Sequence, residues 1–180
     1  MIMKRILFFF VSVVLLASCI NDQESLQNIH NRDLVAIKNY IENTQINGVK
    51  TEQDNQSGVV IIWTELSGSD QSPVANESVK ANYTGSYLDG VVFDTSVDSV
   101  ARENNMFNPN RTYEPLEFRV GATPKQVIAG FDYGLLQMNV GDIAVVLIPS
   151  QSAYGSTPPQ GIRKDAVLRF DVELVEILGR

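Results

Sequence analysis

The segment YTGSYLDGVVFDTS (residues 83–96) places side chains that can do chemistry at the ends of a predicted hairpin. The Asp89-Gly90 pair between alternating apolar residues is a strong signal for a tight turn between two antiparallel strands. Tyr83 lies in the first strand, and Phe93 and Asp94 close the second. A carboxylate beside a large aromatic ring, where a strand ends, suits the edge of an apolar pocket.

The usual signatures of covalent, metal or phosphate chemistry are missing from the predicted domain. The chain has one histidine, His30, and one cysteine, Cys19, and both precede the first predicted strand. A Ser-His-Asp triad and a zinc site are therefore excluded there. The sequence has no glycine-rich phosphate loop and no nucleophile elbow, and Asp89, Asp94 and Asp98 lack the ligand spacing of a calcium-binding loop. We therefore expect no metal and no cofactor.

Aromatic and aliphatic side chains instead recur near the ends of the predicted elements. They fall in four segments, VKANYTGSYLDGVVFDTS (79–96), VIAGFDYGLLQMNVGD (127–142), PSQSAYGS (149–156) and LRFDVELVEI (168–177). In this order and with these spacings, the four segments resemble the FKBP-type peptidyl-prolyl cis-trans isomerase family. The resemblance covers roughly residues 58–180, and its weight comes from the four segments together.

The resemblance implies a small catalytic group and a wider set of residues that binds the substrate. The catalytic group consists of Tyr83, Phe93, Asp94 and Tyr154. The binding set consists of Leu116, Phe118, Val127, Ile128, Phe131, Ile162 and Phe170. By the same resemblance, the Ile128 backbone N–H and the Tyr154 hydroxyl donate hydrogen bonds to the bound peptide. Asp94 either contacts the polarised carbonyl carbon or holds Tyr83. Phe131 stands where the best-known members carry tryptophan, and Leu116 where they carry an aromatic residue.

Such a site requires no nucleophile, proton donor or metal. Resonance holds a peptide bond planar with a barrier of about 18–20 kcal/mol. The planar amide is more polar than the twisted one, because its charge separation fades as the bond turns. An apolar pocket therefore disfavours the planar form. We expect isomerase activity on proline-containing polypeptides. The alternatives are a non-catalytic chaperone of the same fold and an accessory subunit of an envelope machine, such as a gliding or secretion apparatus.

Strands and one short helix must position these residues. Apolar alternation predicts strands over 59–68, 78–90, 91–96, 115–121, 142–150 and 166–178. Thr123 as N-cap, Pro124 at the first helical position and apolar residues at helical spacing predict a helix near 124–135. These elements make an α+β domain. The resemblance implies an antiparallel half-barrel sheet wrapped around that helix.

An insertion, residues 97–115, separates Asp94 from Leu116 by more than the spacing of the minimal family domain. Loops of this size without structure of their own are uncommon and often functional. We expect Met106 and Phe107 either to pack back on the domain or to meet a partner. The loop is thus the predicted contact for an envelope complex.

Residues 1–18 are predicted to be a bacterial lipoprotein signal peptide. Lys4 and Arg5 precede an apolar run of about twelve residues, too short to span a membrane core of roughly 30 Å. The run ends in LASC and resembles a lipobox, which implies cleavage before Cys19 and a lipid on its sulfur. The alternative is a secretory signal followed by a chance cysteine. Because Ile20 rather than aspartate follows, we expect anchoring in the cell envelope, with the outer membrane favoured and the domain facing the periplasm or the surface.

Residues 19–57 are predicted to be a tether and a short helix that precede the isomerase domain, residues 58–180. Polar residues 20–33 indicate the tether, and Asp33 is the predicted helix cap. The apolar face of the helix would consist of Leu34, Ile37, Tyr40 and Ile41. Asn47-Gly48 would end it, and residues 50–58 form a second polar linker. In this arrangement the chain is similar to gliding-motility-associated FKBP lipoproteins.

Composition and charge exclude two classes of protein. Hydrophobic residues make up 44% of the chain and charged residues 19%, which suits a folded domain rather than a disordered one. The formal net charge of −7 argues against nucleic-acid binding, because affinity for a phosphate backbone depends on Lys and Arg. We therefore expect polypeptide and membrane partners and no nucleic acid.

Overall fold

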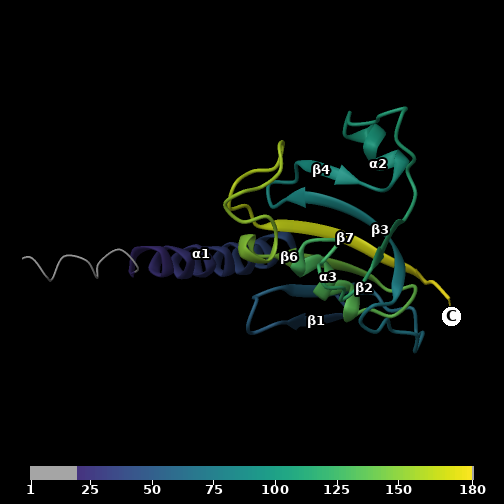
Figure 1. Ribbon diagram of the computed structural model, residues 1–180, viewed down its shortest axis with the longest axis horizontal. Coiled ribbons are helices and arrows are strands. Elements are labelled where there is room, and N and C mark those ends of the chain that lie inside the picture. Colours follow the sequence, from purple (N-terminus) through teal and green to yellow (C-terminus); the bar gives the residue numbers. More distant parts are fainter. Residues whose placement is uncertain (1–19, 180) are drawn as a thin grey trace, which may run out of the picture.

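An antiparallel sheet with helices packed on both faces makes up the folded chain (Figure 1). The computed structural model describes residues 20–179, with residues 20–25 described by their backbone alone. The helical elements are α1 (Ile20–Thr44), α2 (Asp98–Glu103), α3 (Ala129–Leu136) and the 3₁₀ turn η2 (Ser150–Ser152). The strands are β1 (Lys50–Gln53), β2 (Val60–Glu65), β3 (Ser78–Tyr87), β4 (Val92–Thr95), β5 (Leu116–Arg119), β6 (Ile143–Ile148) and β7 (Leu168–Ile177). The predicted α+β class is confirmed.

The sheet has the order β1-β2-β6-β7-β3-β4, and β5 also pairs with β3. Every pairing is antiparallel, as predicted. The long strand β7 alternates buried and half-buried residues, which is the period of two that a pleated strand imposes. The predicted hairpin is present, with a turn between Tyr87 and Val91 in which Gly90 takes the left-handed conformation that favours glycine (φ 87°).

The two faces of the sheet bury different clusters of apolar side chains. In β2, Ile61 and Trp63 belong to the main core, which α3 covers. Their neighbours Val60 and Ile62 belong to a second cluster, which α1 covers. Successive side chains on a strand point to opposite faces, so a continuous apolar run is what a strand buried on both sides requires. The middle of the sheet is therefore covered on both faces.

Helix α3 begins later than the sequence predicts. Its N-cap is Ile128, with an extended backbone, rather than Thr123. The buried Asp132 carboxylate in the helix accepts hydrogen bonds from the Gly121 N–H (2.7 Å) and from the Lys125 ammonium group. These bonds fold the preceding segment back against α3, so residues 124–128 form its approach and not its first turn. The prediction of Thr123 as the cap is wrong for this reason.

Helix α1 covers residues that the sequence predicts as a tether. The predicted apolar face is confirmed, since Ile37 is buried and Tyr40 and Ile41 pack against the second cluster. Asp33 is not a cap, because it lies inside the helix with its side chain fully buried. The polar residues before it are compatible with a helix that meets the sheet only over its later turns. Among residues 20–179, none of the helices is both long and apolar enough to cross a membrane.

The predicted second linker is partly a strand. Lys50–Gln53 forms β1, which pairs with β2 at the edge of the sheet. All four residues of β1 are exposed, so no apolar alternation marked the strand in the sequence. The prediction of a linker over residues 50–58 is therefore corrected at its beginning.

The insertion has structure of its own, which the sequence reasoning did not foresee. It contains α2, in which Arg102 pairs with Asp98 one turn earlier. The Phe107 ring is stacked on Tyr113 (17° between planes, centres 5.5 Å apart) and lies under the Arg102 guanidinium. Phe107 thus packs within the insertion. A partner for this loop stays a prediction.

The close approach of α3 to β6 depends on Gly130. A β-carbon there would collide with Ile148 and lie 3.2 Å from Val59. Overpacking of this kind costs about 1–3 kcal/mol, more than the roughly 0.5–1 kcal/mol that alanine gains over glycine in a helix. We expect Gly130→Ala to lower the free energy of unfolding in urea. Gly134→Ala in the same helix is the comparison and should lower it less, since its β-carbon would come to 3.1 Å from Val146, which is tight but not a collision. Equal stability of the Gly130→Ala protein and the wild type would contradict this account.

Candidate active site

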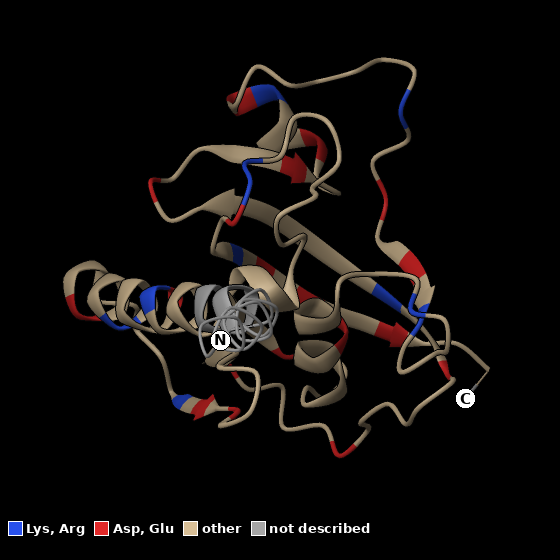
Figure 2. Cartoon of the chain, turned by 60° about the vertical axis from the view of Figure 1, so that its left-hand side comes forward, with Lys and Arg blue, Asp and Glu red and all other residues tan. Residues whose placement is uncertain are grey.

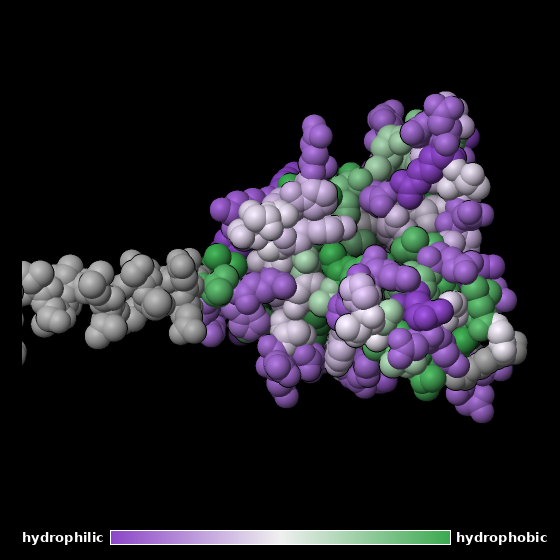
Figure 3. Space-filling view, viewed as in Figure 1, coloured by the Kyte–Doolittle hydropathy of each residue, from purple (hydrophilic) through white to green (hydrophobic). Residues whose placement is uncertain are grey.

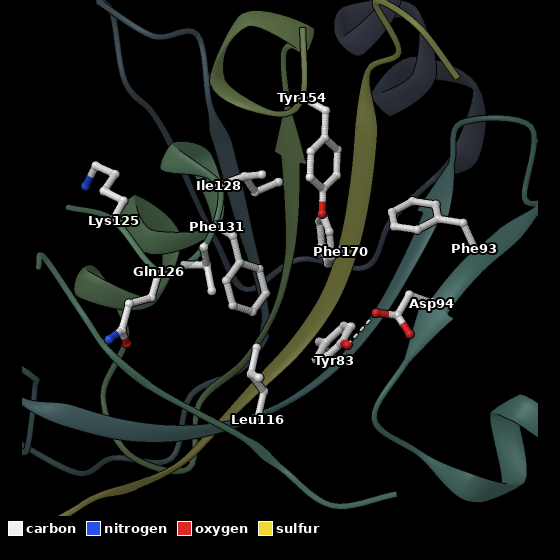
Figure 4. A pocket seen from close by; sticks show the side chains of 11 residues that line it. Tyr83, Phe93, Asp94, Leu116, Lys125, Gln126, Ile128, Phe131, Tyr154 and Phe170 are labelled. Carbon is white, nitrogen blue, oxygen red and sulfur yellow. Dashed lines mark hydrogen bonds between the residues drawn. The ribbon is translucent and has the colours of Figure 1, made fainter. Parts of the chain in front are cut away.

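A cavity of about 420 Å³ opens where the approach to α3 faces the strands of the sheet (Figure 4). Its lining comes from segments far apart in the sequence, and most of the predicted site residues are part of it. The lining residues are Tyr83, Phe93, Asp94, Leu116, Lys125, Gln126, Val127, Ile128, Phe131, Tyr154 and Phe170.

Two buried aromatic rings, Phe131 of α3 and Phe170 of β7, form the floor of the cavity. Their centres lie 5.1 Å apart with the planes at 63°. The Tyr83 ring meets Phe131 edge-on, with centres 6.0 Å apart. Aromatic rings attract one another in such edge-to-face arrangements, and each ring restricts the movement of the next. The floor is therefore apolar and held in place by the core beneath it.

Phe93 reaches the cavity because Gly85 in β3 has no side chain. A β-carbon on Gly85 would lie 2.7 Å from the Phe93 ring and 2.9 Å from the Phe170 ring. Phe93 in turn packs edge-on against Phe170, with centres 5.7 Å apart. Sequence reasoning missed Gly85, although a glycine inside a strand pattern is a known signal of close approach.

Asp94 lies at the edge of the cavity and accepts three hydrogen bonds. The donors are the Tyr83 hydroxyl (2.6 Å), Nη1 of Arg111 (2.5 Å) and the Thr95 backbone N–H (2.9 Å). Arg111 also donates to the Tyr83 hydroxyl (3.2 Å). Exposed ion pairs contribute little stability on their own. These bonds instead hold the carboxylate and the phenol in one orientation, and the bond to Tyr83 is one of the two contacts expected of Asp94.

Arg111 is a site residue that the sequence reasoning missed. It comes from the insertion, 17 residues after Asp94. It is one basic residue in the polar run NPNRT, which has no periodicity or motif. Only the path of the insertion over the edge of the sheet brings its guanidinium to the site.

The two tyrosines of the site are both stable hydroxyl donors. Burial raises the pKa of Tyr83 to about 12, with the hydrogen bond and the charge of Asp94 adding to the effect and Arg111 opposing it. Burial, followed by the charge of Asp94, also raises the pKa of Tyr154. The Tyr154 hydroxyl points into the cavity (Figure 4), and within residues 20–179 it donates to no protein group. It is therefore available to a ligand.

Val127 and Ile128 form the side of the cavity next to α3. Ile128 has an extended backbone (φ −60°, ψ 145°) and stands immediately before the first helical residue. The N–H groups at the start of a helix lack partners within the helix. This position can therefore offer a backbone donor beside an apolar wall.

Two predicted binding residues lie outside the cavity lining. Phe118 is buried in the core with its ring centre 5.8 Å from Phe131, so it supports the floor from behind. Ile162 lies on the loop between η2 and β7, where its N–H donates to the Pro159 carbonyl (3.2 Å). Lys125 and Gln126 line the cavity instead. The sequence reasoning placed these two residues inside the predicted helix and so overlooked them.

The arrangement can bind an apolar ring and hold the carbonyl groups next to it. It combines aromatic and aliphatic walls with one free phenol, one fixed carboxylate and a helix-start backbone. Over residues 20–179, no three His, Cys, Asp or Glu side chains come close enough together to hold a metal ion.

The raised pKa of Tyr83 leads to a pH-dependent prediction. Between its ordinary pKa of about 10 and its folded value of about 12, the folded protein keeps a proton that the unfolded chain has lost. The free energy of unfolding should therefore fall as pH rises through this range. The phenolate absorbance of the wild type minus that of Tyr83→Phe gives the Tyr83 titration. Asp94→Asn should lower its midpoint partway toward 10, and a wild-type midpoint near 10 would contradict the prediction.

Comparison with known proteins agrees with this geometry. A family model described as FKBP-type peptidyl-prolyl cis-trans isomerase matches residues 69–175. A second, described as a prokaryotic membrane lipoprotein lipid attachment site, matches residues 3–19, which lie outside the described residues. The match supports the predicted lipoprotein form of the chain, and Cys19 is the last residue that it covers.

Individual relatives match over part of their length. Peptidyl-prolyl cis-trans isomerase FKBP11 of Bos taurus is 39% identical over 103 residues, which are 57% of this chain and 43% of that protein. The isomerase FkpA of Aeromonas hydrophila is 35% identical over 135 residues, 75% of this chain and 42% of that one. The chain therefore spans less than half of each. The crystal structure of FkpA from Escherichia coli superposes with a TM-score of 0.60 at 28% identity, over 86% of this chain and 63% of that one. By its fold, its cavity and the family model that matches more than half of it, the chain belongs to the FKBP-type peptidyl-prolyl cis-trans isomerase family.

Proposed function

We propose that this protein accelerates the cis-trans isomerisation of X-Pro bonds in exported polypeptides. The observation that carries the proposal is the cavity itself, which has an aromatic floor, apolar walls and the unpartnered Tyr154 hydroxyl within the described chain. Family membership supports the same reaction. Uncatalysed exchange of an X-Pro bond takes roughly tens to hundreds of seconds, so a lower barrier would remove a slow step in folding.

The apolar walls act on the reacting bond by removing water. A planar amide carries a partial negative charge on oxygen and a partial positive charge on nitrogen, and water stabilises both. Between the Phe93 ring and the floor of Phe131 and Phe170, a bound prolyl ring would lose that hydration. A polar group costs free energy when it is buried without partners. The twisted amide is less polar, so burial raises its energy less and the barrier between the isomers falls.

The hydrogen-bonding groups at the edge of the cavity would orient the peptide. The Tyr154 hydroxyl and the Ile128 backbone N–H are the proposed donors to peptide carbonyl groups. Asp94 is held by Tyr83 and Arg111, so its carboxylate is in place before the substrate binds. Groups that need no reorganisation favour the transition state over the free substrate. No covalent intermediate is involved.

The proposed location is the cell envelope, with a lipid on Cys19 as the anchor. The attachment-site model ends at this residue, and α1 starts at the next one. Stable anchoring by lipids requires more than one acyl chain, which a diacylglycerol supplies. The absence of aspartate after Cys19 favours the outer membrane. The substrates would then be polypeptides that have crossed the inner membrane.

The isomerase proposal is tested on a short X-Pro peptide with the protein purified in mild detergent. We expect a clear acceleration by the wild type. Loss of one hydrogen-bond donor is worth about 0.5–1.5 kcal/mol, so Tyr154→Phe should lower kcat/KM by up to roughly 10-fold. Phe93→Ala should also lower it by opening the wall to water. Tyr133→Phe, which removes a phenol outside the cavity lining, is the matched control. A wild-type rate equal to the uncatalysed rate would overturn the proposal and leave a binding or chaperone module.

The anchor is tested by growing cells that express the protein with radioactive palmitate. The wild type should carry the label and sediment with membranes. Cys19→Ala should lose both properties, because Cys19 is the only cysteine. Ser18→Ala keeps a small residue before the cleavage site and should stay labelled. An unlabelled wild type, or labelled Cys19→Ala, would contradict the anchor.

A further inference from the structure

Helix α1 is hydrogen-bonded to both ends of the loop that carries Tyr154. We call residues 150–166 the site loop. Near its start, Oδ2 of Asp33 accepts the Ser150 backbone N–H (2.8 Å) and the Ser150 hydroxyl (2.5 Å). Near its end, Nη2 of Arg32 donates to the Asp165 carbonyl (2.8 Å). The same guanidinium donates to the other Asp33 oxygen (2.6 Å), so neighbouring residues of one helix hold both ends.

Within the site loop, a second set of bonds passes next to Tyr154. The Ser150 carbonyl accepts the Gly155 N–H (2.9 Å). The Gly155 carbonyl accepts the Asp165 N–H (2.9 Å). Gly155, which follows Tyr154, is therefore hydrogen-bonded to the two loop residues that α1 contacts, Ser150 and Asp165. A shift of α1 relative to the sheet would move both of these residues together.

Burial makes the contact between α1 and the site loop specific. The side chain of Asp33 is 0% exposed, and Ser150 is also fully buried. A buried carboxylate is stable only when it is paired and hydrogen-bonded in good geometry. Close packing adds to the constraint, because a β-carbon on Gly58 would collide with Leu34 and lie 3.3 Å from both His30 and Pro149. The buried hydrogen bonds and this close packing therefore restrict the position of α1 against the loop.

Figure 1 shows the later turns of α1 beside the segment between β6 and β7, and Figure 2 shows that the same helix carries both basic and acidic residues. The sequence distance across the contact is 117 residues, so no local folding requirement accounts for it. The exposed Gln151 side chain also donates to the Leu26 carbonyl, one turn or more before Asp33.

We propose that Asp33, together with Arg32, is a positioning residue of the active site, which makes α1 part of the catalytic unit rather than a spacer. The inference rests on the proposed function, because it acts through the Tyr154 hydroxyl. Asp33 touches no substrate. It holds Ser150, and Ser150 holds the Gly155 backbone that sets the direction of the Tyr154 side chain. A loop held at both ends keeps its hydroxyl donor in place before the peptide binds.

The chain offers a matched control for a merely structural role. Asp142 is also a buried carboxylate (2% exposed) that accepts a serine N–H and hydroxyl, both from Ser67 (2.9 and 3.0 Å). It also accepts the Asn139 N–H (2.9 Å), and none of these residues lines the cavity. Asp142→Ala removes the same kind of bonds as Asp33→Ala but leaves the site loop untouched.

The first test is a double-mutant cycle, measured where circular dichroism shows every variant folded. Asp33→Ala should lower kcat/KM by about 5-fold, in the range that coupled residues show. In the Tyr154→Phe background the same substitution should have almost no further effect, because the hydroxyl it positions is gone. Asp142→Ala should leave kcat/KM unchanged. The milder Asp33→Asn keeps one oxygen acceptor for Ser150 and should give an intermediate loss of kcat/KM. It replaces Asp33→Ala in the cycle if Asp33→Ala does not fold. Equal losses with and without the Tyr154 hydroxyl would overturn the proposal.

The second test does not depend on activity. Amide hydrogen exchange in residues 150–155 should be faster in the Asp33 variant than in the wild type, and unchanged in Asp142→Ala. If the wild type proves inactive, the proposed function fails and this measurement alone decides whether α1 holds the loop. Unchanged exchange in residues 150–155 would overturn the proposal even for an active enzyme.

Discussion

The register of β3 against β7 is the constraint on which the rest of the site depends. It places Gly85 opposite Phe170 and Tyr83 opposite Val172. The space over Gly85 admits the Phe93 ring, and the Phe170 ring contacts both Phe93 and its partner in the cavity floor, Phe131. A slip by one residue would turn every side chain of β3 to the other face. The buried Val79 and Ala81 of β3 oppose such a slip, because it would remove both side chains from the core.

The polar groups of the site are held differently from its apolar walls. The walls belong to the sheet and to α3, so core packing places them. The donors and the carboxylate stand at the edges of elements and depend on further hydrogen bonds. Asp94 depends on Tyr83 and on Arg111 of the insertion, and Tyr154 depends on a loop bonded to α1. The face of the molecule viewed in Figure 3 is largely hydrophilic, with apolar residues showing near its centre.

Much of the fold could be predicted from the sequence, and most of the missed secondary structure lies in segments without an apolar pattern. Strands β2 to β7 and the hairpin at Asp89-Gly90 follow from apolar alternation and turn residues, and all are present. The exposed strand β1 and the mostly exposed residues 26–32 of α1 have no such pattern, since a solvent-facing segment needs no apolar face. Ile162 was expected in the cavity by analogy with a family loop, and it is not among the residues that line the cavity.

The sequence by itself determined the family, the positions of β2 to β7 along the chain and the aromatic character of the cavity, because these depend on residue type and short-range spacing. Tertiary structure alone decided which polar groups meet. Arg111 reaches Asp94 across 17 residues, and Asp33 reaches Ser150 across 117. A polar side chain has no intrinsic partner in the sequence, since it pairs with whichever group the folded chain brings within about 3 Å. Periodicity can therefore predict the walls of this site, and only the path of the chain decides what holds its hydrogen-bonding groups in place.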